Sequence, residues 1–242
     1  MSVIKSNILV SPQELFTSSA TQGTDVGAFV TTGDGRYFRY FLNGAVTAVV
    51  GKVFQGPAED AVNQSPAGGL SVAAAAVGAT TVTTTSAVTL AANLIAGGFL
   101  SVAIAPGQGQ NLKIKSHPAV TAAAVTFTLE DALQVALTTA SKVVVHKNVY
   151  DQCVIAPATL TAAVAGVSIF AVVNAQYGWL QTHGPASCLL TGAFASAGLA
   201  VGVLVGGTIG SLAPAVAGTN VLGYTMGIGA TTEHDAVFLQ ID

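Results

Sequence analysis

Charged side chains are scarce in this sequence of 242 residues, because Asp, Glu, Lys and Arg together make up 8% of it. Globular chains typically carry about a quarter. Two long stretches, 61–112 and 152–232, contain no charged residue, and no Lys or Arg follows Lys147. A free monomer normally uses surface charge to prevent association, so we infer that an assembly covers much of this surface.

The sequence also lacks a basic patch and a long apolar helix. Its net charge is −3, and binding to a phosphate backbone requires clustered Lys and Arg, so we expect no nucleic-acid partner. The N-terminal "MSVIKSNILVSPQ" lacks the uninterrupted apolar core of a signal peptide. The apolar stretch 192–218 is rich in Gly and interrupted by Pro214, which favours strands and turns over a membrane span.

Cysteine is nearly absent, with Cys153 and Cys188 alone. Without a secretion signal we expect reduced thiols, and the sequence leaves open whether the two residues pair. The stretch "NAQYGWLQTHGPASCLL" (174–190) raises the hypothesis of a nucleophilic pair of Cys188 with His183. The apolar "ASCLL" favours the other interpretation, a small core residue whose burial makes the thiol inert.

Signatures of metal binding and catalysis are missing as well. The histidines have no metal-ligand spacing, and neither CxxC nor HExxH nor GxSxG occurs. Adjacent acids such as Glu59-Asp60 and Glu130-Asp131 coincide with turn signals, where solvated loop carboxylates are common. We predict no catalytic residue, no metal and no cofactor. The histidines are His117, His146, His183 and His234.

Glycine and small β-forming residues are abundant instead. "ATTVTTTSAVTLA" is rich in Thr and Val, which suit pleated strands, and "NLKIKSHP" alternates apolar and polar residues as a half-buried strand does. Short runs of this kind recur near the 8–12-residue interval that is typical of sandwiches and barrels. We therefore predict an all-β protein with antiparallel β-sandwich or barrel domains and an extended N-terminal arm.

Four segments follow from the turn and linker signals. Residues 1–24 form the arm, 25–65 a β-hairpin region that packs with the C-terminal domain, 66–150 a middle β-domain, and 151–242 a C-terminal barrel or sandwich.

Within these segments we expect particular strands and turns. Asp34-Gly35 predicts a hairpin turn between "GAFVTT" and "RYFRYF", with "VTAVVGKVF" as the next strand. "DALQVALTTASKVVVH" is interpreted as a strand, with a short helix ahead of it as the alternative. Later strands are expected at "CVIAPA", "SIFAVV", "YGWLQT", "SCLL", "AVGVLVG", "VLGYTMG" and "AVFLQI", with "HGP" as a turn between the third and the fourth.

Arginine and aromatic residues concentrate the binding energy of protein interfaces, which makes "RYFRYF" the best interaction candidate. Alternation along a strand sends half of these side chains to each face, so a core role for one face is an equal hypothesis. Two aromatic residues of 174–190 join the candidate interface. Its members are Arg36, Tyr37, Phe38, Arg39, Tyr40, Tyr177 and Trp179.

The order of several segments resembles virion structural proteins of tailed bacteriophages. The resemblance runs through "DGRYFRYFLNGAVTAVVGKVFQGPAED", "VGATTVTTTSAVTLAANLIAGGFLSV", "IKSHPAV", "VTFTLEDALQVALTTASKV", "NAQYGWLQTHGPA" and "VFLQID", and covers most of 25–242. It implies a non-enzymatic capsid decoration, or cement, protein that is made in the host cytoplasm and stabilises the exterior of the shell. The implied partners are the major capsid protein and further copies of this chain, as a homotrimer or another homo-oligomer.

Three other functions stay open at this point. A head fibre or tail component would use the same β-domains elsewhere on the virion. A carbohydrate-binding β-module would use exposed aromatic rings, for which Tyr177 and Trp179 are the candidates. A hydrolase would require Cys188 and His183 to meet. The sequence leaves open the host, the symmetry axis and the copy number, and whether the middle domain binds a host surface.

Overall fold

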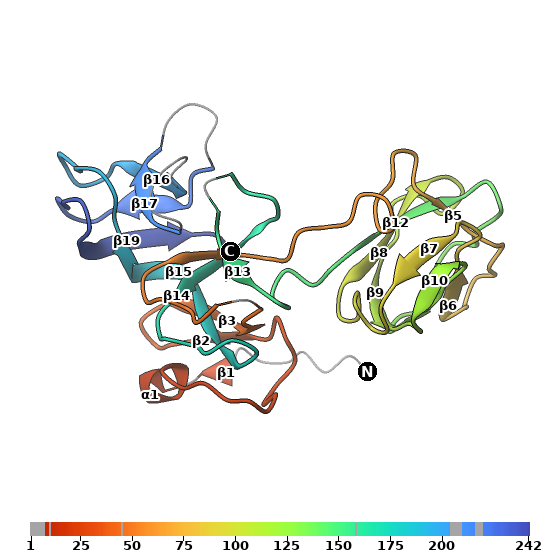
Figure 1. Ribbon diagram of the computed structural model, residues 1–242, viewed down its shortest axis with the longest axis horizontal. Coiled ribbons are helices and arrows are strands. Elements are labelled where there is room, and N and C mark those ends of the chain that lie inside the picture. The colour runs from red at the N-terminus through yellow and green to blue at the C-terminus, as the bar shows by residue number, and fades with distance from the viewer. Residues whose placement is uncertain (1–7, 10, 45, 158, 204–209, 216–219) are drawn as a thin grey trace. The chain divides into compact units, whose positions relative to one another are not determined.

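The chain folds as two units in the computed structural model, which describes residues 8–9, 11–44, 46–157, 159–203, 210–215 and 220–242. Unit 1 combines Met1–Pro57 with Val149–Asp242, and unit 2 is Ala58–Asn148. Figure 1 shows this nesting in colour, since red and blue segments share unit 1 while yellow and green segments form unit 2. Unit 2 is therefore an insertion between the two halves of unit 1.

The prediction of an all-β, antiparallel fold is confirmed. Every strand pair in the described residues is antiparallel except β1 with β2, and the single short helix is α1 (Pro12–Leu15). The strands of unit 1 are β1 (Ile8–Leu9), β2 (Phe29–Thr31), β3 (Tyr37–Leu42), β4 (Val53–Gln55), β13 (Val154–Ile155), β14 (Val164–Ser168), β15 (Tyr177–Leu189), β16 (Ala200–Val203), β17 (Leu212–Pro214), β18 (Gly223–Thr225) and β19 (His234–Gln240).

Strand β15 is the centre of unit 1. The sheet runs in the order β1-β2-β3-β15-β19-β18-β16-β17, and β14 also pairs with β15 while linking it to β4 and β13. The first half of β15 pairs with β3 and the second half with β19. One long strand thus joins the N-terminal and C-terminal parts of the chain.

The predicted hairpin turn at "HGP" is wrong, because β15 runs through His183, Gly184 and Pro185 without a break. The register against β3 shifts between Gln181 and His183, and Gly184 adopts a φ of +82°. A bulge and a glycine at positive φ bend a strand without ending it. The turn residues therefore mark the point where β15 changes partners.

Alternation along β15 separates the core from the outside. Its even-numbered residues are all buried, including Leu180, Ala186 and Cys188. They join two apolar clusters, one around Phe41 and Phe54 and another that contains the second half of β15. The clusters lie on opposite faces of the sheet, because the bulge between Gln181 and His183 exchanges the faces to which odd-numbered and even-numbered residues point. The odd-numbered residues are mostly half-buried or exposed, as the period of two requires.

The N-terminal segment packs on the odd-numbered side of β15. Leu15 of α1 is buried in a small cluster with Val30 and Phe38, and Trp179 packs against that cluster. Ser19 exchanges backbone hydrogen bonds with Tyr177, with N···O distances of 3.1 and 2.8 Å. The described part of the expected arm, residues 8–9 and 11–24, is therefore attached to unit 1, whereas residues 1–7 and 10 lie outside the described residues.

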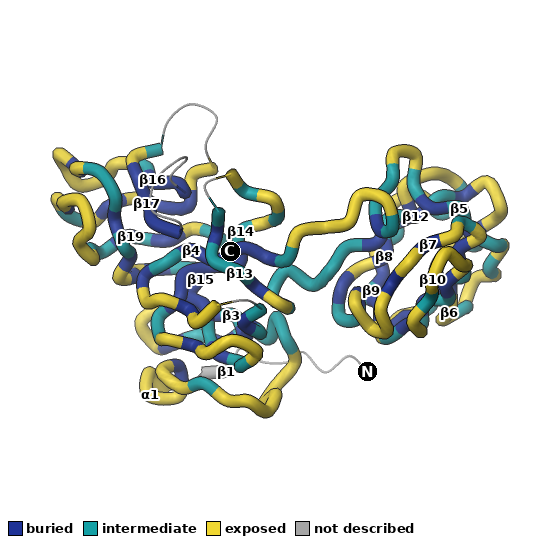
Figure 2. The backbone as a smooth tube through the Cα atoms, in the orientation of Figure 1, coloured by how far each residue is buried: buried dark blue, intermediate teal, exposed yellow. Residues whose placement is uncertain are grey.

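Unit 2 encloses its own core. A six-stranded sheet has the order β5-β12-β8-β9-β11-β6, and β10 pairs with β7 beside it. Figure 2 shows buried residues gathered on the strands of each unit and exposed ones on the connecting loops. The strands are β5 (Leu70–Ser71), β6 (Thr81–Thr83), β7 (Val88–Leu90), β8 (Phe99–Ile104), β9 (Asn111–Ser116), β10 (Val120–Ala123), β11 (Thr126–Leu129) and β12 (Lys142–His146).

Several expected boundaries differ from the observed ones. Residues 58–65 belong to unit 2, where the Val145 amide donates to Gln64 O at 3.0 Å. The alternative of a short helix before β12 is wrong, because 131–141 forms turns and bridges. Of "VTAVVGKVF" the structure keeps only β4 as a strand, and in place of "SIFAVV" the strand is the preceding β14. In both apolar stretches, valines that the sequence predicts in strands therefore lie in loops.

Candidate interaction surface

The side chains of "RYFRYF" divide between core and surface. Phe38 and Tyr40 are buried, whereas Arg36, Tyr37 and Arg39 are half-buried at the surface. The burial pattern of β3 follows the alternation expected of a strand in a sheet with two packed faces. The core hypothesis therefore applies to Phe38 and Tyr40, whereas an interface role for Arg36, Tyr37 and Arg39 stays a prediction.

Arg39 is engaged within unit 1. Its Nε donates to Asp242 Oδ2 at 2.8 Å, and its guanidinium carbon lies 5.0 Å from the ring centroid of Phe29 and 5.7 Å from that of Tyr150. These contacts hold a cation flat against aromatic faces. Burial, and secondly the negative charge of Asp242, raises the pKa of Tyr150 to about 12. Arg39 therefore fastens the C-terminal end of the chain to β3.

Tyr177 and Trp179 pack against Tyr40. The Tyr177 ring is stacked on it with centroids 5.7 Å apart, and the Trp179 ring meets it edge-on at 5.0 Å. The Tyr40 hydroxyl accepts a hydrogen bond of 3.0 Å from the Gly23 amide. The three rings thus hold the N-terminal segment on the sheet, which gives Tyr177 and Trp179 a packing role there.

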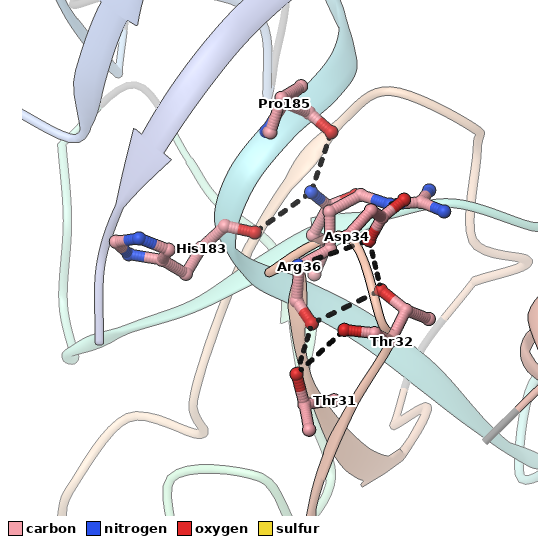
Figure 3. Close-up of polar contacts among 7 residues, drawn as sticks. Thr31, Thr32, Asp34, Arg36, His183 and Pro185 are labelled. Atoms are coloured by element: carbon pink, nitrogen blue, oxygen red, sulfur yellow. Dashed lines mark hydrogen bonds and ion pairs between the residues drawn. The ribbon is translucent and has the colours of Figure 1, made fainter. Parts of the chain in front are cut away.

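The Asp34-Gly35 turn is confirmed and is braced by its own side chains. Thr32 donates its hydroxyl hydrogen to Asp34 Oδ1, and Arg36 Nε donates to Asp34 Oδ2 at 2.9 Å. The Thr32 hydroxyl is the largest cause that lowers the pKa of Asp34, with the Arg36 amide and guanidinium next. Figure 3 shows this cluster beside β15, at the height of the bend.

A glutamine holds the bend of β15 in place. Gln181 Nε2 donates to two carbonyls of its own strand, His183 O at 3.0 Å and Pro185 O at 2.8 Å (Figure 3). Its side chain is buried, so the two bonds satisfy an amide that would otherwise be unpaired. Pro185 has no N–H to offer, which suits a strand position next to a bulge.

His183 and Cys188 lie on opposite sides of β15, so the structure does not bring them together. The thiol is buried in the apolar cluster, and burial raises its pKa to about 12. Burial likewise raises the pKa of Cys153 well above its usual value. Both cysteines are free. Burial thus disfavours the thiolate, which is the reactive form, at both cysteines.

The remaining histidines have separate structural partners. His117 accepts from the Ile95 amide at 3.1 Å through Nε2, and burial lowers its pKa. His146 Nδ1 lies 2.6 Å from Glu59 Oε1, and His234 Nε2 lies 3.2 Å from a backbone carbonyl. In the part of the chain that the structure describes, no three His, Cys, Asp or Glu side chains could hold a metal ion together.

An aromatic row crosses the surface of unit 1. Phe29 meets Tyr37 edge-on at 5.2 Å, the Tyr37 ring stacks on His183 at 4.8 Å, and His183 meets Phe238 at 5.3 Å. Phe238 is paired with Tyr224 on the next strand. Figure 3 shows the His183 ring pointing away from the Asp34 cluster.

We call the solvent-facing side of the second half of β15 and its neighbours the outer face. Along the strands, its residues alternate with buried residues such as Val237 and Leu239, which point to the other face. Tyr224 and Met226 are 42% and 49% exposed, and a depression of about 320 Å³ opens beside β15 and β19. The outer face consists of Pro185, Ser187, Ala200, Tyr224, Met226, Ala236 and Phe238.

A second apolar surface lies on two adjacent loops of unit 1, which we call the valine loops. Buried Asn43 ties them together, because its Nδ2 donates to Val46 O at 2.7 Å and to Val172 O at 2.8 Å. The Ala48 amide donates to Val172 O at 2.7 Å. Their exposed side chains are Val46, Val49, Val50 and Val173.

Sequence reasoning missed both surfaces for different reasons. At the valine loops the sequence predicts strands, because Val favours strands wherever it occurs. The outer face had a usable signal in "VFL" (237–239), since three successive apolar residues in an antiparallel strand place apolar side chains on both faces. Such a strand either packs against a core on each of its faces or leaves one apolar face uncovered.

Comparisons with protein-family models, with curated proteins and with solved structures found no match. Among the described residues, no helix has both the length and the apolar character that crossing a membrane requires.

Proposed function

We propose that this protein is a non-enzymatic structural protein of a tailed-bacteriophage virion, a decoration protein that binds and stabilises the outer surface of the capsid. The proposal starts from the resemblance of the segments in 25–242 to such proteins. It is supported by the low charge of the chain and by the buried thiols of Cys153 and Cys188. The partner is the major capsid protein, and the site of action is the exterior of the virion.

The observation that carries the proposal is the exposed apolar surface of the valine loops. Val46, Val49 and Val50 project from a loop whose backbone is fixed by hydrogen bonds to Asn43 and to Ser168. A preformed surface loses little conformational freedom on binding. Contiguous apolar side chains on a structured loop are typical of a protein–protein contact.

Binding of this kind depends on repetition. A few valines give a weak single contact, but many copies on one particle gain avidity when copies also touch each other. A protein that acts by covering a lattice needs surface and no active site. An apolar, uncharged contact also keeps its strength when the salt concentration changes, because screening acts on charges.

The experiment is electron microscopy of virions made by the genome that encodes this chain, followed by co-sedimentation of the purified protein with heads that lack it. We expect symmetric density on the head exterior and saturable binding. Val49→Asp should reduce binding at least about tenfold, because it places a charge in an apolar contact. Val135→Asp in unit 2 is the matched control, since Val49 is 46% and Val135 49% exposed.

Absence of the protein from the head would overturn the proposal, and density on the tail would replace it with a tail component. If only Val135→Asp weakens binding, the contact belongs to unit 2 and the assignment to the valine loops is wrong.

A further inference from the structure

One face of the sheet around β15 is covered along the first half of that strand only. There Leu180 and the neighbouring Phe41 of β3 are buried in an apolar cluster. The bulge between Gln181 and His183 exchanges the faces to which odd-numbered and even-numbered residues point, so Pro185 and Ser187 lie on this same face beyond the bend. Both are exposed, and they belong to the outer face.

The outer face has the composition of a protein interface. Aromatic residues and Met are enriched in the centre of interfaces, where charged residues are depleted. Tyr224, Met226 and Phe238 supply such side chains. The strands that form the face contain one charged residue, Asp235, which pairs in register with buried Cys188 on the opposite side.

We propose that the outer face binds the outer face of a second copy of this chain, related by a two-fold axis. In such a contact each group meets the same surface in the partner, so a charged face would repel itself. The seven residues of this face are uncharged, and Asp235 is the one carboxylate that lines the depression beside it. Arg39 Nε is paired with Asp242 Oδ2 within the same chain at 2.8 Å. Charge repulsion between two copies is therefore confined to Asp235.

The size of the face is suited to this partner. Strands lie about 4.8 Å apart and rise about 3.4 Å per residue, so residues 183–189 of β15 together with β19, β18 and β16 present about 340 Å² in projection. The accessible surface of protruding side chains exceeds their projection, which brings the face close to the roughly 500 Å² per partner that a small specific interface needs. Two sheets would then stack face to face at about 10 Å, as in a sandwich.

The experiment measures the mass of the purified chain by analytical ultracentrifugation across the micromolar range, without any capsid. We expect a concentration-dependent dimer. Tyr224→Lys and Met226→Lys, tested singly, should each raise the dimer dissociation constant about a hundredfold, because each buries an unpaired cation. Tyr224→Thr preserves strand preference and should weaken the dimer less. The fluorescence of Trp179 checks that each variant is folded.

The matched control is Val49→Lys, a change of similar exposure on the valine loops. It should leave the dimer intact. A wild-type chain that stays monomeric, or a dimer that survives both lysine variants, would overturn the proposal. Dissociation by Val49→Lys as well would show a head-to-tail contact and would overturn the two-fold arrangement. Because no shell is present, the result is independent of the proposed function.

Discussion

Replacing Gly184 with alanine tests whether the bend of β15 holds unit 1 together. Gly184 is buried at a φ of +82°, and an added Cβ would lie 3.2 Å from Arg36 Cγ and 3.4 Å from Arg36 Cα and Gly35 O. A left-handed backbone costs a non-glycine residue about 1–2 kcal/mol. Crowding adds about 1 kcal/mol, the lower end for an added methylene, because only Arg36 Cγ must move and by a few tenths of an ångström. We expect unit 1 to lose about 2–3 kcal/mol of unfolding free energy.

Gly35→Ala is the matched control. Gly35 has nearly the same φ, +84°, but a Cβ there would meet nothing within 4 Å. It should therefore lose only the backbone contribution, about 1–2 kcal/mol. The difference between the two variants isolates the packing of β15 against the Asp34-Gly35 turn.

The assay is urea unfolding followed by tryptophan fluorescence. Trp179 is the only tryptophan, and it lies in unit 1. The signal therefore reports unit 1 alone, which matters because two units can unfold in separate steps. With a slope of about 2 kcal/mol per molar urea, the midpoints of the variants should differ by about 0.5 M. Equal midpoints would refute the reasoning, since the contact with Arg36 would then carry no energy.

Three further outcomes follow from buried polar groups. Asn43→Ala should cost unit 1 about 2–3 kcal/mol in the same assay, because two loop carbonyls lose their donor. Cys153 and Cys188 should react with a thiol reagent at pH 8 only after unfolding, and prompt labelling of native protein would contradict their burial. Burial lowers the pKa of His117 below 6.5, so its neutral form stabilises unit 2 above pH 6.5, and that contribution is lost as the pH falls below it. Protection of the Ile95 amide from hydrogen exchange should fall in that window and should be insensitive to pH in His117→Gln.

The sequence was sufficient to predict an all-β fold and, in general terms, the packing of residues 25–65 with the C-terminal domain. Alternation in "NLKIKSHP" predicted β9, because a half-buried strand leaves a period of two, and the bulky aromatic residues of "RYFRYF" predicted β3. The same rule could not tell strand valines from loop valines at 46–50, since loop conformation there depends on Asn43 and on β14, far away in the sequence.

The error at "HGP" has a specific physical cause. Gly and Pro mark a local interruption, and the sequence does not show whether the chain reverses or only bends. At Gly184 a buried amide from Gln181 satisfies the carbonyls on either side and keeps the strand extended. The candidate interface was only partly predictable, because burial of Phe38 and Tyr40 depends on the N-terminal segment that packs over them.

The insertion of unit 2 has a consequence for the order of events during synthesis. Strand β4 pairs with β13 and β14, which follow it after the whole of unit 2. At about 5–20 residues per second, those partners leave the ribosome roughly 5–20 seconds later. Unit 2 has all of its own strands by then and is able to fold first. Once unit 2 is folded, the flexible chain between β4 and its partners is shorter, so less conformational entropy is lost when these strands pair. The folding of unit 2 is therefore one step in the assembly of unit 1.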